Sequence, residues 1–259
     1  AFEAGIDRTN NKLVSIVNSD PQFRGGNNNA AWDAEDRTLL GRPVSDINRT
    51  NLRTAATNKG TGWAMNTYGA QRALYYLFIL EHGTRNSQAA VNASLDANGF
   101  KQGGLGAGVT NLSASTWSSW NSYYPFVEMG YSNSLGTGTG EVALPMPSGY
   151  GSLTTYVNRY RGIELPFGHI WKNTDGINLK ASATEGNLPF VTDDLSLFND
   201  VNYNGFTALG QASSSNGYIQ KMLSDSIFPL EVGTNRWGDY YLQSLPGSGE
   251  DLRTVLFGG

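Results

Sequence analysis

The chain contains no cysteine, which excludes disulfides, thiolate metal sites and cysteine nucleophiles. Histidine is almost as scarce, since His82 and His169 are the two histidines among 259 residues. A Ser-His-Asp triad would need one of them. His82 follows a helical stretch, His169 lies in an expected strand, and no Gly-x-Ser-x-Gly segment accompanies either. The sequence therefore favours a protein that binds a partner without catalysing a reaction.

The sequence also has few charged residues and no long apolar segment. Charged residues make up 15% of the chain, the net charge is -4, and the Lys and Arg residues are scattered. Binding to a phosphate backbone needs clustered positive charge, so we do not expect a nucleic-acid partner. The longest apolar stretch, Ala73–Leu80, is far shorter than the ~20 residues of a membrane span, so we do not expect membrane insertion.

Glycine and aromatic residues are plentiful. There are 32 glycines, and aromatic residues make up 12% of the chain, a share that argues against disorder. Glycine and asparagine tolerate positive φ, so we expect long ordered loops, above all over residues 100–153. The glycine runs at 103–108 and 136–140 lack the lysine of a phosphate-binding loop. With the helix and the short strands described below, we expect an α+β protein.

One helix is strongly indicated around Gln71–Glu81. Five residues recur there at helical spacing: Ala70, Leu74, Leu77, Phe78 and Glu81. All but the last are apolar, so they predict a buried stripe that includes Leu77. Gly83 is expected to end this helix, and Asn86–Leu95 to form a second one.

We expect residues 1–60 to form an N-terminal arm, in which Leu52 could contact a core, and residues 61–259 to form the main domain. Alternation and turn residues predict short strands in the second half of the chain. The candidate strands are Leu153–Val157, Gly168–Trp171, Ile177–Lys180, Asp239–Leu242 and Arg253–Phe257.

Two pairs of neighbouring carboxylates stand at Asp193-Asp194 and Glu250-Asp251. A glycosidase needs two carboxyl groups across a cleft, whereas adjacent residues of a strand face opposite sides. Clusters of His or Cys that could hold a transition metal do not occur. Calcium takes Asp and backbone oxygens, so Asp175-Gly176 and Asp193-Asp194 are the places where it could bind. We expect no other cofactor.

Two segments of the chain resemble a known family. Residues 168–173, Gly-His-Ile-Trp-Lys-Asn, resemble the Gly-Asn-Val-Trp-Glu-Trp signature of the formylglycine-generating-enzyme superfamily. Residues 253–259 are similar to its Arg-Val-x-Arg-Gly-Gly-Ser-Trp segment. Residues 161–176 resemble a branch common among gut bacteroidal phages and their hosts. The residues that carry the motifs are Gly168, Trp171, Gly258 and Gly259.

The resemblance, which covers roughly residues 60–259, implies a C-type-lectin-like fold: a small, mostly antiparallel sheet with two helices and long ordered loops rich in Gly and Asn. Members of this branch often bind ligands, and some are the variable proteins of diversity-generating retroelements. Enzymes of the superfamily use cysteines or metal-binding histidines, so their activity is not expected here. In the variable proteins the displayed binding segment follows the Gly-Gly, so we expect that such a segment either lies beyond Gly259 or has been trimmed from this member.

A binding surface is predicted shortly before that Gly-Gly. Its candidate residues are Trp237, Asp239, Tyr240, Tyr241 and Arg253. Glycines on both sides of Trp237 place it on a loop. Tyr240 and Tyr241 face opposite sides of a strand, so one of them can stand at the surface. Packing in the core is the alternative for Tyr240 and the expectation for Trp171.

These observations leave three hypotheses of function. The first is a receptor-binding or adhesive protein of a phage tail or fibre or of a bacterial surface, with a host surface protein or glycan as partner. The second is a structural virion protein that contacts other virion proteins, and the third is a degenerate modifying enzyme or glycosidase. We expect a virion or extracellular location and, by analogy with tail-associated lectin-like proteins, a homotrimer.

Overall fold

The computed structural model describes residues 2–17, 44, 47–90, 129–145, 154–168 and 171–257. The chain is an α+β protein with small antiparallel sheets, as the sequence predicts. It divides into two compact units that interleave along the sequence. Unit 1 comprises residues 1–63, 88–171 and 258–259, and unit 2 comprises residues 64–87 and 172–257. The first change of unit, after Trp63, lies close to the expected boundary at residue 60, and the role of residues 1–60 as an arm stays a prediction.

Two α-helices occur in the described part of the chain, α2 (Arg49–Thr57) and α3 (Tyr68–His82). Three short 3-10 helices accompany them: η2 (Ser87–Ala89), η3 (Asn133–Leu135) and η4 (Leu195–Leu197). The strands of unit 1 are β1 (Gly5–Asp7), β2 (Lys12–Val14), β3 (Gly140–Pro145), β4 (Thr154–Tyr160) and β5 (Ile163–Glu164). The strands of unit 2 are β6 (Lys172–Asn173), β7 (Ile177–Ser182), β8 (Gly186–Val191), β9 (Thr207–Ala208), β10 (Gly217–Met222), β11 (Pro229–Gly233), β12 (Tyr240–Tyr241), β13 (Glu250–Arg253) and β14 (Leu256–Phe257).

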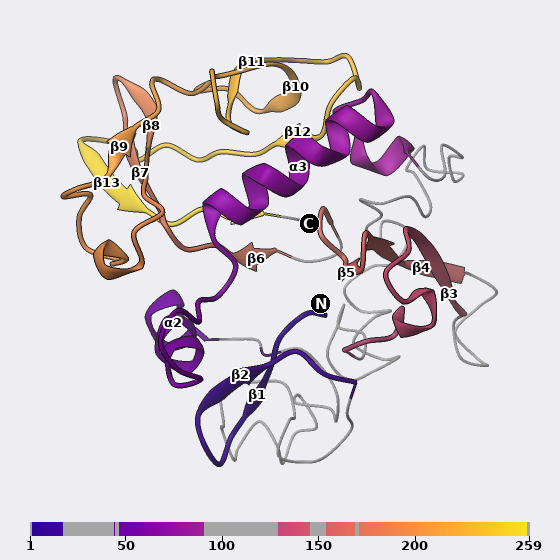
Figure 1. The fold of residues 1–259 in the computed structure, drawn as a ribbon. Helices are drawn as coiled ribbons and strands as arrows, with labels where there is room; N and C mark the ends of the chain where they lie inside the picture. Colours follow the sequence, from indigo (N-terminus) through magenta and orange to yellow (C-terminus); the bar gives the residue numbers. More distant parts are fainter. Residues whose placement is uncertain are drawn as a thin grey trace. The chain divides into compact units, whose positions relative to one another are not determined.

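Unit 1 contains the hairpin β1–β2 with α2 packed against it (Figure 1). The Asn48 side chain caps α2 by accepting a hydrogen bond from the Asn51 amide at 2.8 Å. Leu52, Ala55 and Ala56 form its buried face, so the predicted core contact of Leu52 is confirmed. The α-helix α2 thus lies within the expected arm.

The other sheet of unit 1 has the order β3-β4-β5. Arg161 and Gly162 connect β4 to β5 with φ of 46° and 78°, the left-handed values that a two-residue hairpin turn requires. This turn places Arg159 directly opposite Glu164. β3 occupies part of the stretch that the sequence predicted as loops; residues 101–128 and 146–153 of that stretch lie outside the described residues.

In unit 2, α3 begins and ends as the sequence predicts, but it buries a different face. Thr67 caps its start, and Gly83, with a φ of 63°, donates from its amide to the Ile79 carbonyl at 2.9 Å. The buried residues of α3 are Tyr68, Gln71, Tyr75 and Phe78. Leu77 is 39% exposed, so the prediction that it lies in the core is wrong. The tyrosines take the inner positions because their hydroxyls find buried partners there.

The Tyr75 hydroxyl donates to the Arg85 carbonyl at 2.6 Å, and the partners of Tyr68 and Tyr76 lie in the turn between β10 and β11, beside which α3 runs (Figure 1). The Tyr68 hydroxyl donates to Ser226 Oγ at 3.1 Å, and the Tyr76 hydroxyl donates to the Ser226 carbonyl at 2.9 Å. Arg72 adds a bond from Nη1 to the Asp225 carbonyl at 3.1 Å. The sheet with order β11-β10-β12 is therefore tied to α3 by polar tips on aromatic and long side chains.

The predicted strands around residues 153–157, 177–180 and 239–242 are confirmed as β4, β7 and β12. The segment 253–257 holds two strands, the end of β13 and all of β14, because β13 pairs with β7 whereas β14 pairs with β6. The expected helix 86–95 is wrong in its described part, where η2 makes one short turn and residues 91–95 lie outside the described residues. Gly168 and Trp171 are not in strands.

Candidate binding surface

The candidate binding residues gather around β12 of unit 2. β12 pairs with β10, which places Tyr240 opposite Tyr218 and Tyr241 opposite Gly217. The rings of Tyr218 and Tyr240 meet edge to face with centroids 5.1 Å apart, and the Arg236 guanidinium lies 5.8 Å from the Tyr218 ring centroid. We call Tyr218, Arg236, Trp237 and Tyr240 the aromatic surface.

Two rings of this surface are open to solvent. Trp237 is 66% exposed and Tyr240 is 56% exposed. Tyr241 is half-buried on the other side of the strand, and its hydroxyl accepts a hydrogen bond from Asn187 Nδ2 at 3.1 Å. Alternation along β12 thus turns Tyr240 outward and Tyr241 inward. A role for Trp237 and Tyr240 in binding stays a prediction, but both are accessible to a ligand.

The backbone beneath the rings is held from several directions. Gly238 is buried and forms a parallel bridge with Arg85. A Cβ atom at Gly238 would lie 2.6 Å from the Ile219 carbonyl oxygen, so glycine is required for this close approach. The Asn235 carbonyl accepts from Gln220 Nε2 at 2.7 Å. The exposed rings therefore stand on a backbone that is fixed in place.

Asp239, between the two exposed rings, points inward. Its Oδ1 accepts from the Ser87 amide at 2.8 Å and from Ser87 Oγ at 2.9 Å. Its backbone amide donates to the Arg85 carbonyl at 3.0 Å, and the Tyr75 hydroxyl donates to the same carbonyl at 2.6 Å. Burial raises the pKa of Asp239 to about 6, although the bonds from Ser87 oppose this rise. The bonds from Ser87 to Oδ1 hold the Asp239 carboxyl beneath the aromatic surface, and its role in ligand binding stays a prediction.

The other candidates belong to other elements of the chain. Arg253 belongs to β13, in the sheet of order β13-β7-β8-β9. Its guanidinium binds Asp251 Oδ2 at 3.0 Å and the Ser244 carbonyl. Trp171 is 64% exposed, so the expectation that it packs in a core is wrong. Gly168 is buried, whereas His169, Gly258 and Gly259 lie outside the described residues.

Two of the expected calcium ligands have hydrogen-bond partners in the protein. Asp175 is buried, and its Oδ1 accepts from the Gly176 amide at 3.0 Å. Asp194 is exposed and caps η4 by accepting from the Ser196 amide at 2.9 Å. Among the described residues, no three or more His, Asp or Glu side chains form a group that could hold a metal ion, and calcium binding at these positions stays a prediction.

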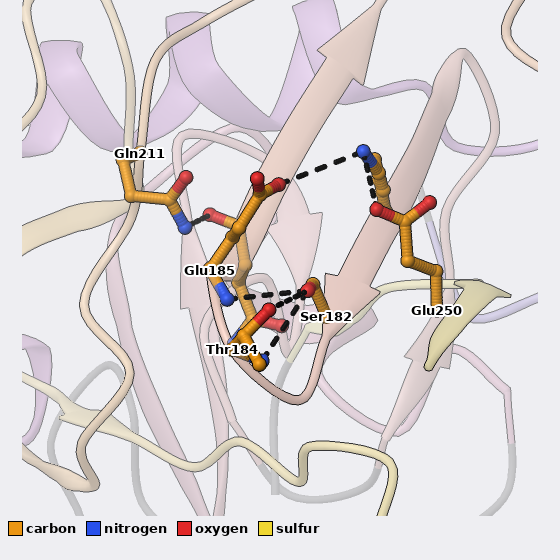
Figure 2. A network of polar contacts seen from close by, with 7 residues as sticks. Ser182, Thr184, Glu185, Gln211 and Glu250 are labelled. Carbon is orange, nitrogen blue, oxygen red and sulfur yellow. Dashed lines mark hydrogen bonds and ion pairs between the residues drawn. The ribbon is translucent and has the colours of Figure 1, made fainter. Parts of the chain in front are cut away.

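The acidic residues near the β7–β8 hairpin are tied to cations (Figure 2). Lys180 Nζ lies 2.7 Å from Glu250 Oε1 and 3.7 Å from Glu185 Oε2. Asp251 has Arg253 as its partner. Ser182 Oγ accepts from the Glu185 amide at 3.1 Å and so closes the hairpin turn. Glu250 and Asp251 thus each belong to an ion pair at the surface, with Lys180 and Arg253 respectively. Such exposed ion pairs contribute little to the free energy of folding.

A buried polar network in unit 1 was missed by sequence reasoning. Glu164, 3% exposed, accepts from the amides of Gly130 and Ser132, both at 2.8 Å, and from Ser132 Oγ at 2.6 Å. Arg159, 4% exposed, donates from Nη1 to Ser132 Oγ at 3.2 Å and from Nε to the Gly136 carbonyl at 2.7 Å. The spacing of Arg159 and Glu164 around the Arg161-Gly162 turn could have shown them to be cross-strand partners. The network holds the segment 130–136 to the β4–β5 hairpin.

No family model matches the chain, and neither the curated proteins nor the solved structures contain a significant match. None of the helices in the described ranges has the length and apolar character needed to cross a bilayer. The aromatic surface is the feature of the molecule from which a function can be inferred.

Proposed function

We propose that this chain is a non-enzymatic receptor-binding or adhesive protein of a phage particle, associated with its tail or fibre, or of a bacterial surface. The aromatic surface binds a host surface protein or glycan. The observation that carries the proposal is the exposure of Trp237 and Tyr240 on a backbone fixed by Gly238 and Asp239. Rigid exposed aromatic rings give a large contact area at small entropic cost on binding. The location that goes with this proposed function is the virion or the exterior of the cell.

We further propose that the fold is of the C-type-lectin-like type of the formylglycine-generating-enzyme superfamily. The pairing of β14 with β6 supports this, since Leu256 lies opposite Asn173 and Phe257 opposite Lys172. Residues 172–173 of one resembling segment therefore lie beside residues 256–257 of the other. Small antiparallel sheets with two helices are also consistent with such a fold.

A structural virion protein is the second candidate function. Leu77 and Leu80 of α3 are 39% and 83% exposed, and Val201 is 79% exposed. Exposed apolar side chains of this kind suit contacts with other proteins of a particle. In this case the partners would be virion proteins, and the aromatic surface would serve assembly.

A pull-down separates the two candidates. The full chain, labelled at a surface lysine, is incubated with intact gut bacteroidal cells and, in parallel, with purified phage particles that lack it. A receptor-binding or adhesive protein is retained by the cells, and a structural protein by the particles. Retention by particles alone would contradict the proposal. Turnover of a glycan or peptide that a single carboxylate substitution abolishes would contradict the non-enzymatic assignment.

A further inference from the structure

We infer that the ligand of the aromatic surface is an uncharged glycan, bound by stacking of a pyranose ring on Trp237 with Tyr240 beside it. The inference rests on the proposed function and names the ligand class of the same site. Three features of the described residues support it: the size of the surface, its charge and its rigidity.

The first feature is size. The exposed large apolar side chains of this region are confined to one short stretch: Trp237, Tyr240 and Leu242. Of the exposed residues that flank them, Thr234, Asn235 and Ser244 are polar and uncharged. The exposed Arg236, directly before Trp237, is charged, and its guanidinium lies over the Tyr218 ring. A protein–protein interface typically takes about 800 Å² and 20–30 residues from each partner, with an apolar centre. Two rings bordered by hydroxyl and amide groups match one or two sugar rings better.

The second feature is charge. The carboxyl of Asp239 is turned inward to Ser87, and Glu231 has Lys221 as its partner at 3.4 Å. The Arg236 guanidinium lies over the Tyr218 ring. The face of an aromatic ring carries partial negative charge, which attracts the slightly positive C–H groups on one side of a pyranose. Side-chain amides and hydroxyls such as those of Asn235 and Thr234 can both donate to and accept from sugar hydroxyls.

The third feature is rigidity. A single sugar offers few contacts, so the free energy gained on binding is small. A site for it must therefore have its rings already ordered, because ordering them on binding would cost affinity. The bridge between Gly238 and Arg85, the bond from the Asp239 amide to the Arg85 carbonyl, and the bond from Gln220 to the Asn235 carbonyl order the backbone on both sides of Trp237. Edge-to-face packing on Tyr218 orders the Tyr240 ring. The surface is therefore preformed.

The test is ligand-observed saturation-transfer NMR on the full chain, with the methyl glycosides of glucose, galactose, mannose and N-acetylglucosamine as probes. We expect transfer to the C–H protons on one face of at least one glycoside. Trp237→Ala and Tyr240→Ala should weaken this binding about tenfold or more. Trp237→Phe, which keeps a ring, should retain most of it. Trp63→Ala is the matched control, since Trp63 is 53% exposed in unit 1, and it should bind as the unaltered chain does.

The inference is overturned if no glycoside receives saturation, or if Trp63→Ala weakens binding as much as Trp237→Ala does. Attachment to cells separates this failure from failure of the proposed function. Attachment that depends on Trp237, survives periodate oxidation of the cells and is lost after protease treatment would indicate a protein receptor, so the glycan inference would fail and the proposed function would stand. Attachment that is independent of both Trp237 and Tyr240 would show that the aromatic surface is not the binding site, so the proposed function would lose its supporting observation.

Discussion

Asp239 shows how a side chain of the candidate surface can be held by partners elsewhere in the protein. It was selected from the sequence because it stands between aromatic residues in a loop-to-strand segment. The structure turns its carboxyl toward Ser87 and its amide toward Arg85. Sequence could not show this, because the partners lie far away along the chain. The outward position of one tyrosine, in contrast, followed from alternation alone.

The raised pKa of Asp239 makes the stability of unit 2 depend on pH. Because the folded pKa is about 6 and the ordinary value is 3.8, folding favours the neutral carboxyl. This stabilisation is fully present below about pH 4 and is lost as the pH rises through about 6. Relative to Asp239→Asn, which stays neutral, the unaltered chain should lose at most about 3 kcal/mol over this range. Urea unfolding of both chains between these pH values measures the difference, and a difference that is constant with pH would contradict the assignment.

Glu164 is the residue of unit 1 whose loss should matter most. In Glu164→Gln the side chain keeps one acceptor, but its amide group faces donors from Gly130 or Ser132. A buried donor then lacks its acceptor, so the free energy of unfolding should fall by roughly 2–3 kcal/mol. The control is Glu231→Gln on the exposed face of β11, which should change it by less than about 0.5 kcal/mol. Equal effects of the two substitutions, measured by denaturant unfolding, would show that the Glu164 network carries little stability.

At the scale of elements, α3 separates what sequence can predict from what it cannot. Its position, its capping threonine and its terminal glycine all follow local rules. Its buried face does not, because it includes Gln71 and two tyrosines, which are less apolar than leucine. Their tips bond to Ser226, Arg85 and other groups that only the folded chain brings near. Likewise, residues 253–257 look like one strand, but two different partners divide them.

Phe78 and Leu77 are adjacent on α3 and should differ sharply in their contribution to stability. Phe78 is 0% exposed and stacks near Tyr75 and His82, whereas Leu77 is 39% exposed. Phe78→Ala should lower the free energy of unfolding by about 3–5 kcal/mol through the cavity it leaves. Leu77→Ala should lower it by less than about 1 kcal/mol. Thermal or urea unfolding of the two variants provides the comparison. A larger loss of stability for Leu77→Ala would show that α3 buries the face that carries Leu77.

At the scale of the whole molecule, the interleaving of the two units was beyond the reach of sequence reasoning. Residues 64–87 join residues 172–257 through bridges such as Thr67 with Asp175 and Arg85 with Gly238. Contacts between such distant segments leave no local pattern. The α+β class was predictable, because helical spacing and alternation indicate a helix and short strands. The small antiparallel sheets were expected from the resemblance to the superfamily.

We propose that the protein assembles as a homotrimer. A surface low in charge and rich in polar uncharged groups can be covered without isolating charges, and closed symmetry is the usual form of such assemblies. Light scattering should report three times the chain mass of 28.0 kDa. A single species of one chain mass at high protein concentration would contradict this.

The central claim is that the protein acts by binding through Trp237 and Tyr240. It is tested most directly by the affinity of the full chain and its variants for intact gut bacteroidal cells. Trp237→Ala and Tyr240→Ala should each weaken attachment by about 1–3 kcal/mol, with unfolding midpoints close to that of the unaltered chain. Trp63→Ala should attach normally. Unchanged attachment of both Trp237→Ala and Tyr240→Ala, or a loss that is fully explained by unfolding, would contradict the claim.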